Sequence, residues 1–207
     1  MTRESALPPI VLYDAEGRRK FVTRDERALF LRTAATCLGE VRTFCNVLAY
    51  AGCHLTEALE LTFERVDAKR QTLTFESLRK RRAGVFRTVP VPPQLIEMLD
   101  QVHNVRERRG RGRYRFLWRW SRTSAWRKVR EVMVMAGIEG PQATSIGLRH
   151  GFGVIAAECD VPLTLLQKWM GHASIEITAS YVQTRKRDDY YFAARMWEDN
   201  AEIEAVF

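Results

Sequence analysis

Four side chains in the last third of the sequence could do chemistry on a phosphodiester. Arg149 and His150 are adjacent, His172 follows a glycine, and Tyr181 lies nine residues after His172. A phenol can act as a covalent nucleophile, while guanidinium and imidazole groups can hold phosphate oxygens and stabilise the charge that develops on them. The set therefore predicts covalent phosphoryl transfer that requires no metal and no other cofactor.

Each of these residues also has a plain structural explanation when it is considered alone. An aromatic side chain near a helix end usually packs in a core, an arginine such as Arg149 can form a surface ion pair, and a histidine after Gly171 can end a helix. Tyr190 and Tyr191 are nearby phenols, but they do not share the spacing of Tyr181. The joint occurrence of all three residue types favours a phosphodiester site.

The positive charge of the chain is concentrated in its middle. The formal net charge is +8 at pH 7, and residues 69–131 contain 18 Lys and Arg against 5 Asp and Glu. Residues 1–68 and 132–207 each contain slightly more acidic than basic side chains. A basic middle between near-neutral flanks predicts a surface that binds a polyanion, and a merely solvated basic face is the alternative.

Double-stranded DNA is the favoured ligand because aromatic residues interleave with the arginines of this segment. These aromatic residues are Tyr114, Phe116, Trp118 and Trp120. The cations expected to contact DNA are Arg79, Arg81, Arg82, Arg122, Arg127 and Lys128.

Composition also disfavours several classes of protein. No apolar run approaches the roughly 18 residues that a membrane helix needs, and residues 1–4 lack the character of a signal peptide. Cys37, Cys45, Cys53 and Cys159 form no CxxC pair, which disfavours a zinc site and favours buried thiols in a reducing cytosol. We therefore expect a cytoplasmic protein, associated with the bacterial nucleoid, with no membrane partner.

Capping residues and hydrophobic spacing predict helices in the first quarter of the chain. Thr23 and Glu26 form a capping box for a helix that ends near residue 35. Its inner face is expected to contain Leu29, Phe30 and Ala34. A second helix is expected over residues 40–51 and stops at Gly52, and a short third helix begins near Thr56.

The hydrophobic period then changes from that of a helix to that of a strand. Short β-rich runs around Leu73 and Val89 predict an antiparallel hairpin whose basic tip contains Arg79 and Lys80. Beyond it, the spacing predicts a helix over residues 94–104 and an Arg/Gly-rich loop over 106–115. Two further helices are expected to be capped by Ser124 and by Ser145. The last two are expected from Pro162 to Met170 and after a Ser174 cap, with Tyr181 in the last turn.

These motifs together resemble the tyrosine recombinases, the phage integrase family. The strongest match is Leu148-Arg149-His150, then Leu166 to His172, then Tyr181 at the family's spacing. Supporting matches are the segments 50–61 and 87–92. The resemblance covers residues 23–197 and implies a mainly helical α+β catalytic domain with a small antiparallel sheet.

The resemblance also implies a domain organisation and a chemical role for each site residue. Residues 1–22 would be an N-terminal extension and residues 198–207 a tail, with no separate core-binding domain. Tyr181 would attack DNA and form a 3′-phosphotyrosine, Arg149 would bind the phosphate, and His172 would hydrogen-bond the phosphate or the tyrosine oxygen. Lys80 would be the general acid and Glu57 a buttress for the site.

Two positions depart from the family pattern. His54 stands where the family normally has an arginine, and Ile146 stands where it has a basic residue three positions before Arg149. An imidazole cannot form the two-pronged contact of a guanidinium, and losing one such donor typically costs on the order of 10²–10³ in rate. Any general-base role would pass to His150 or to water.

Three functions remain in competition. The first is a site-specific recombinase that breaks and rejoins double-stranded DNA as a homo-oligomer assembled on that DNA, with weakened activity. The second is a catalytically impaired DNA-binding accessory or regulatory protein with the same fold, which His54 and Ile146 favour. The third takes residues 162–181 as a helix-turn-helix, although this leaves the Arg149 motif unexplained.

Overall fold

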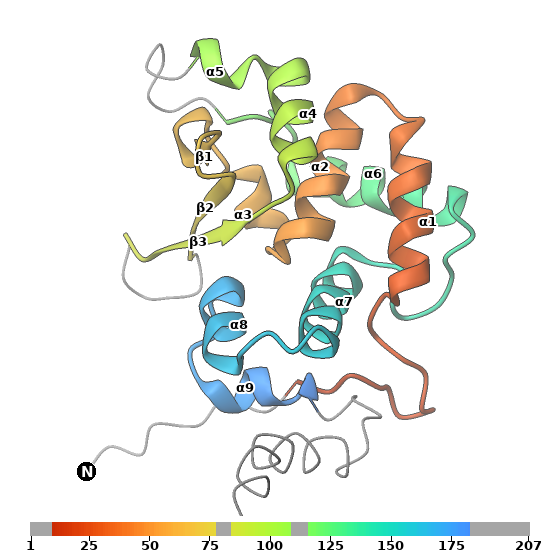
Figure 1. Ribbon diagram of the computed structural model, residues 1–207. Coiled ribbons are helices and arrows are strands. Elements are labelled where there is room, and N and C mark those ends of the chain that lie inside the picture. Colours follow the sequence, from red (N-terminus) through yellow and green to blue (C-terminus); the bar gives the residue numbers. More distant parts are fainter. Residues whose placement is uncertain (1–9, 78–83, 109–115, 183–207) are drawn as a thin grey trace, which may run out of the picture.

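The computed structural model describes residues 10–77, 84–108 and 116–182. Within them the helices and strands follow each other along the chain as shown in Figure 1. They are α1 (Arg24–Ala35), α2 (Gly39–Ala51), α3 (Leu55–Leu59), the 3-10 helix η1 (Phe63–Arg65), β1 (Val66–Asp67), β2 (Thr72–Glu76), β3 (Phe86–Pro90), α4 (Pro93–His103), α5 (Val105–Arg108), α6 (Arg122–Met135), α7 (Ser145–Glu158), α8 (Leu163–Met170) and α9 (Ile175–Ala179). None of the helices described is long and apolar enough to cross a membrane.

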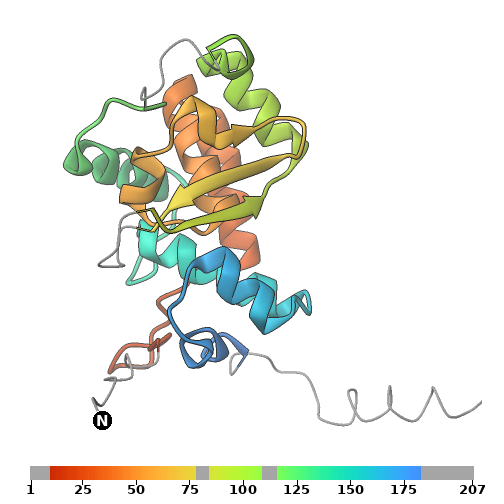
Figure 2. The same ribbon diagram turned by 90° about the vertical axis from the view of Figure 1, so that its left-hand side faces the viewer.

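The sheet has the strand order β1-β2-β3 and is antiparallel throughout. It lies on one flank of the helices, where Figure 2 shows it face on. The predicted hairpin is confirmed, since β2 pairs with β3 in a register that sets Leu73 opposite Val89 and Phe75 opposite Arg87. The short strand β1 was not predicted. The predicted tip residues, Arg79, Lys80, Arg81 and Arg82, lie outside the described residues.

The first two helices form as their capping residues predict. Thr23 accepts a hydrogen bond from the Glu26 amide at 3.2 Å, and the Glu26 carboxylate accepts one from the Thr23 amide at 2.9 Å. Helix α2 ends at Gly52, whose φ of 56° is the left-handed conformation that glycine adopts without steric cost. Phe30 and Ala34 are buried as predicted, whereas Leu29 is 42% exposed, so its placement on the inner face was wrong.

Two predicted caps were wrong by a few residues. Helix α6 is capped by Ser121, whose hydroxyl accepts from the Ser124 amide at 3.1 Å, so Ser124 lies inside the first turn. Helix α7 is capped by Thr144, which accepts from the Gly147 amide at 2.9 Å, instead of by Ser145. Several Ser and Thr residues precede each helix, and local sequence does not distinguish which hydroxyl reaches an amide three residues later.

Other departures concern the predicted loop 106–115 and the last helix. The predicted loop 106–115 begins with helical residues, because α5 extends to Arg108. Helix α9 ends at Ala179, so Tyr181 lies in the turn that follows the helix and not in its last turn. The Tyr181 amide donates to the Thr178 carbonyl at 3.1 Å, which fixes that turn against α9.

In the part of the chain that the structure describes, the buried side chains form two clusters. The larger one fills the space between α1, α2, α4, α6 and the sheet. The smaller one joins α7, α8 and the segment before α1, and it contains Leu12, Phe21 and Tyr181. Trp118 belongs to the larger cluster, is 1% exposed and donates its indole N–H to the Glu40 carbonyl. This corrects the interpretation of Trp118 as part of an aromatic DNA-binding surface.

Candidate active site

Arg149 lies at the centre of the candidate site and is 5% exposed. It is in the second turn of α7, and its Nη1 donates to the Gly52 carbonyl at 2.6 Å while its Nη2 donates to the Met170 carbonyl at 2.7 Å. The guanidinium therefore ties the end of α2 to the end of α8. Burial lowers the pKa of Arg149 to about 10, which leaves the group charged at neutral pH.

Tyr181 is packed against α7 with no exposed surface. A Cβ atom added at Gly153 would lie 2.6 Å from the Tyr181 Cζ atom, so only a glycine leaves room for the phenol ring at this point. The His150 Nδ1 atom lies 3.0 Å from the Tyr181 Oη atom. Burial raises the pKa of Tyr181 to about 12, although the positive charge of Arg149 partly opposes this by lowering the pKa.

The two histidines beside Tyr181 are uncharged at neutral pH. Burial lowers the pKa of His150 to about 4, and the nearby charges of Arg149 and Lys20 act in the same direction. Burial lowers the pKa of His172 to about 3, again with help from Arg149. A neutral imidazole has one nitrogen that can accept a proton, so the His150 Nδ1 atom can act as the acceptor for the phenol.

His172 stacks on the phenol that the sequence predicts as the nucleophile. The ring centroids of His172 and Tyr181 are 6.0 Å apart, with an angle of 17° between the ring planes. The His172 Nδ1 atom lies 3.0 Å from the Thr178 hydroxyl, which orients the ring. Its Nε2 atom is the nitrogen with which it could contact a phosphate oxygen.

Glu57 is buried and forms a two-pronged ion pair with Arg87. The Arg87 Nη1 and Nη2 atoms donate to the two carboxylate oxygens at 2.9 and 2.5 Å, and Arg87 Nε donates to the Trp169 carbonyl at 2.8 Å. Burial alone would raise the pKa of Glu57, but the hydrogen bonds and charge of Arg87 outweigh it, and the net shift is downward. The pair joins α3 to β3 and to α8.

Arg87 was not predicted from the sequence to be a residue of the site. A signal for it exists, because Val85, Arg87, Val89 and Val91 alternate along the strand and an arginine in an otherwise apolar register is unusual. The burial pattern follows this alternation, with Arg87 and Val89 both buried. A buried arginine needs a partner, and Glu57 is that partner.

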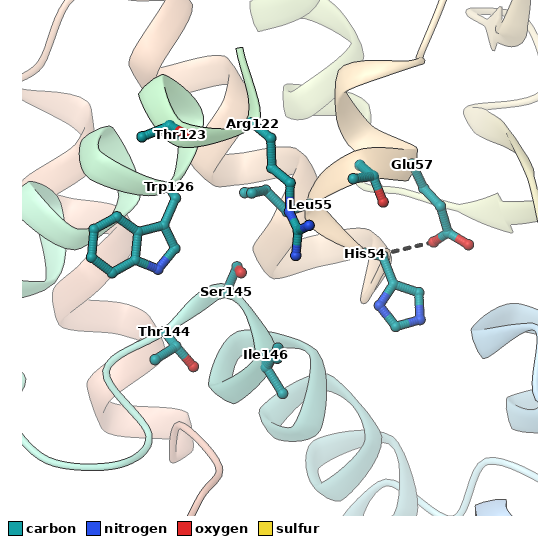
Figure 3. A pocket seen from close by; sticks show the side chains of 10 residues that line it. His54, Leu55, Glu57, Arg122, Thr123, Trp126, Thr144, Ser145 and Ile146 are labelled. Carbon is teal, nitrogen blue, oxygen red and sulfur yellow. Dashed lines mark hydrogen bonds between the residues drawn. The ribbon is translucent and has the colours of Figure 1, made fainter. Parts of the chain in front are cut away.

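His54 and Ile146, the two departures from the family pattern, border one cavity of about 660 Å³. In Figure 3, Glu57 lies beyond His54 as seen from Arg122, and the start of α7 forms the lower side of the cavity. His54 is the residue before α3, and its backbone amide donates to the Glu57 carboxylate at 2.8 Å. Ile146 is 59% exposed at the rim.

The structure brings Arg149, His150, His172 and Tyr181 together around the end of α8. A second cavity, of about 290 Å³, is lined by Arg87, His172 and Lys168. Ser77, which follows β2, and Val85, which precedes β3, also line it. The predicted general acid, Lys80, belongs to the segment between them and lies outside the described residues.

The predicted DNA-binding cations on α6 point in different directions. Arg122 lines the cavity with His54, whereas Arg127 lines a separate, mostly apolar hollow along α6. Lys128 is half-buried, with its Nζ atom 5.0 Å from the centre of the Trp120 ring. Of these three, Arg122 is therefore the one beside the candidate site.

Comparison with known proteins identifies a family for most of the chain. The model of the phage integrase family matches residues 20–188. Tyrosine recombinase XerD of Mycobacterium leprae (strain TN) is 30% identical over 153 residues, covering 68% of this chain and 46% of XerD. Tyrosine recombinase XerA of Pyrococcus furiosus is 28% identical over 149 residues, covering 69% and 49%. The chain spans about half the length of these curated relatives.

Solved structures share the fold at lower identity. The crystal structure of XerA recombinase has a TM-score of 0.67 at 20% identity, covering 87% of this chain and 65% of that one. XerH bound to palindromic difH substrate in a post-cleavage complex has a TM-score of 0.70 at 20% identity, covering 86% and 53%. The catalytic domain of bacteriophage HP1 integrase has a TM-score of 0.61 at 22% identity, covering 79% and 86%. The mainly helical α+β fold predicted from the sequence is the fold of these structures, and the chain belongs to the phage integrase family, the tyrosine recombinases.

Proposed function

We propose that this protein is a site-specific recombinase that breaks and rejoins double-stranded DNA with Tyr181 as its nucleophile. The observation that carries the proposal is the group formed by Tyr181, His150 and Arg149. A phenol oxygen lies 3.0 Å from a neutral imidazole nitrogen, beside a buried arginine that remains charged at neutral pH. This arrangement suits proton removal from a nucleophile next to a bound phosphate.

The proposed reaction conserves the energy of the phosphodiester bond. The Tyr181 oxygen attacks phosphorus, the phenol proton passes to the His150 Nδ1 atom, and the bond from phosphorus to the 5′ oxygen breaks. Lys80 donates a proton to that oxygen, which leaves a 5′-hydroxyl and a 3′-phosphotyrosine. Attack by a 5′-hydroxyl of a second strand reverses these steps, so neither a nucleotide nor a metal is consumed.

Each remaining site residue has a defined part in this reaction. Arg149 holds the non-bridging oxygens in the forked geometry that a guanidinium provides, and His172 contacts the phosphate through Nε2. Glu57 keeps His54 in place through the backbone hydrogen bond. Because Tyr181 has no exposed surface, the turn after α9 must move before the phenol oxygen can reach DNA.

The proposed substrate is DNA, and the proposed assembly is an oligomer on that DNA. The similar XerH structure is of a recombinase bound to its difH substrate, which supports DNA as the substrate here. Recombination requires at least two nucleophiles, one for each exchanged strand, so we propose that several copies assemble on one site. Binding should weaken steeply with salt, because basic contacts to phosphates release counterions. Association with the bacterial nucleoid stays a prediction.

The test uses the full chain and a DNA site selected from a random duplex library by binding to the protein. A duplex with this sequence and a nick placed near the cleavage point loses a short fragment on cleavage, which traps the covalent adduct. We expect a protein–DNA adduct and a released 5′-hydroxyl fragment. Tight binding with no adduct at any nick position would instead support the DNA-binding accessory protein that His54 and Ile146 favour.

A further inference from the structure

His54 and Ile146, which replace the family's basic residues on one wall of the site, are poorly suited to bind a phosphate. His54 and Ile146 both line the cavity of about 660 Å³ in Figure 3. An imidazole offers one or two hydrogen-bond donors without the fork of a guanidinium, and an isoleucine side chain offers none. A phosphate held by Arg149 would therefore be poorly neutralised on this side.

Arg122 enters the same cavity from a third element. It is the first residue of α6 and is exposed, and Figure 3 shows its side chain extending from that helix into the space between His54 and Ser145, above Ile146. Across residues 10–77, 84–108 and 116–182, no hydrogen bond or ion pair engages the Arg122 guanidinium. Its N–H donors are therefore available to a ligand.

Glu57 is the one carboxylate among the described residues that line this cavity, and it does not serve as the partner of Arg122. Both oxygens of Glu57 accept hydrogen bonds from Arg87, and one of them also accepts from the His54 amide. The ion pair of Glu57 with Arg87 is buried, with both side chains about 5% exposed. No described residue neutralises the positive charge of Arg122, which is thus left for an anionic ligand.

We propose that Arg122 binds a non-bridging oxygen of the scissile phosphate and supplies the second guanidinium of the site. It then takes the role that the family pattern assigns to an arginine at position 54, from a different helix. The proposal rests on the proposed function and deepens it, because it gives one of the six predicted DNA-binding cations a specific place in the reaction.

The first test measures the rate of adduct formation in a single turnover, with protein in excess over the nicked duplex so that affinity does not enter. Arg122→Ala is expected to lower this rate by about 10²-fold, the usual effect of losing one preorganised donor. Arg119→Ala removes the same charge from an exposed position outside the cavity and is expected to change the rate less than threefold. Equal rates for the two variants would overturn the proposal.

A double variant distinguishes the role of Arg122 from general DNA binding. His54→Arg restores a guanidinium at the family position, so Arg122→Ala should cost less than about tenfold in that background. An unchanged cost in the His54→Arg background would mean that Arg122 does not act at that phosphate.

A binding measurement keeps the proposal testable even if the protein forms no adduct. A methylphosphonate, which has no negative charge, replaces each phosphate at the centre of the selected duplex in turn. With Tyr181→Phe protein, the affinity is expected to fall about tenfold at one position. Because Arg149 is proposed to contact the same phosphate, the added Arg122→Ala change should reduce that loss without abolishing it, while Arg119→Ala should leave it unchanged. A loss of the same size with and without the Arg122→Ala change contradicts the proposal, whatever the outcome of the cleavage assay.

Discussion

The His150 Nδ1 atom lies 3.0 Å from the Tyr181 Oη atom, and burial keeps the imidazole of His150 uncharged at neutral pH. The two residues come from α7 and from the turn after α9, 31 positions apart. With the pKa of His150 lowered to about 4 and that of Tyr181 raised to about 12, the proton rests on the phenol until a phosphate approaches. In the proposed reaction, the phenol proton therefore passes to His150 as Tyr181 attacks.

Replacing His150 should slow cleavage without weakening DNA binding. His150→Phe keeps the ring but removes the acceptor, and the rate of adduct formation is expected to fall by about 10²–10⁴-fold, the range for a general base. His150→Asn keeps an acceptor near the Nδ1 position and should lose less. Gel-shift affinities serve as the control. Wild-type cleavage by His150→Phe would assign the proton of Tyr181 to another acceptor.

Gly153 should be needed to seat Tyr181. Gly153→Ala places a methyl group 2.6 Å from the present position of Tyr181 Cζ, and this overpacking is expected to cost about 1–3 kcal/mol in the free energy of unfolding. In a Tyr181→Ala background the same change should cost much less, because the ring is gone. Urea denaturation measures both, and equal costs in the two backgrounds would show that Gly153 is not coupled to the ring.

The buried ion pair between Arg87 and Glu57 should be vulnerable to loss of one partner. Arg87→Met leaves the Glu57 carboxylate buried without its counter-charge, and we expect a loss of about 3–5 kcal/mol in stability. Adding Glu57→Gln removes the stranded charge, so the double variant should recover part of that loss. Thermal or urea unfolding of the wild type and of the variants measures these differences in stability. A double variant less stable than Arg87→Met alone would contradict this account.

Stability should fall as the pH drops below about 6.5. The pKa values of His150 and His172 in the folded protein, about 4 and about 3, lie below their ordinary value of 6.5 because both rings are buried near Arg149. Between pH 6.5 and the lowered pKa values, the unfolded chain binds protons on these histidines that the folded chain does not. The contribution of the two neutral histidines to stability is therefore complete above pH 6.5 and is lost as the pH falls. Each pKa unit corresponds to about 1.4 kcal/mol.

Denaturation midpoints measured from pH 7.5 to pH 4.5 test this dependence. The matched control is the double variant His150→Gln, His172→Gln, which should show a shallower decline across the same interval. Identical slopes for the variant and the wild type would mean that other groups cause the acid sensitivity.

The sequence predicted the elements that are determined by interactions between residues close together in the chain. The Thr23–Glu26 capping box, the glycine after α2 and the alternating hairpin strands depend on hydrogen bonds and periodicities within a few residues, and all three form as expected. The juxtaposition of Arg149 with Tyr181 was expected from the joint occurrence of their residue types and from the family resemblance, because no local rule relates residues 32 positions apart.

Long-range partners could not be predicted from sequence. Arg87 is paired with a carboxylate 30 residues away, and the alternation of its strand indicates burial but not the partner. Trp118 was expected on a DNA-binding surface because it follows arginines, yet it packs on Phe44 with ring centroids 5.0 Å apart. Aromatic residues among cations have the same local pattern in a core and on a nucleic-acid surface, and tertiary packing decides between them.

The most direct measurement concerns the phenol itself. Wild-type protein and Tyr181→Phe are each incubated with the nicked duplex that carries the selected site, and the adduct is digested to identify the modified peptide by mass spectrometry. We predict a DNA-linked peptide at Tyr181 for the wild type, and no adduct for Tyr181→Phe at unchanged gel-shift affinity. An adduct that survives in Tyr181→Phe, or that maps to Tyr190 or Tyr191, would contradict the account.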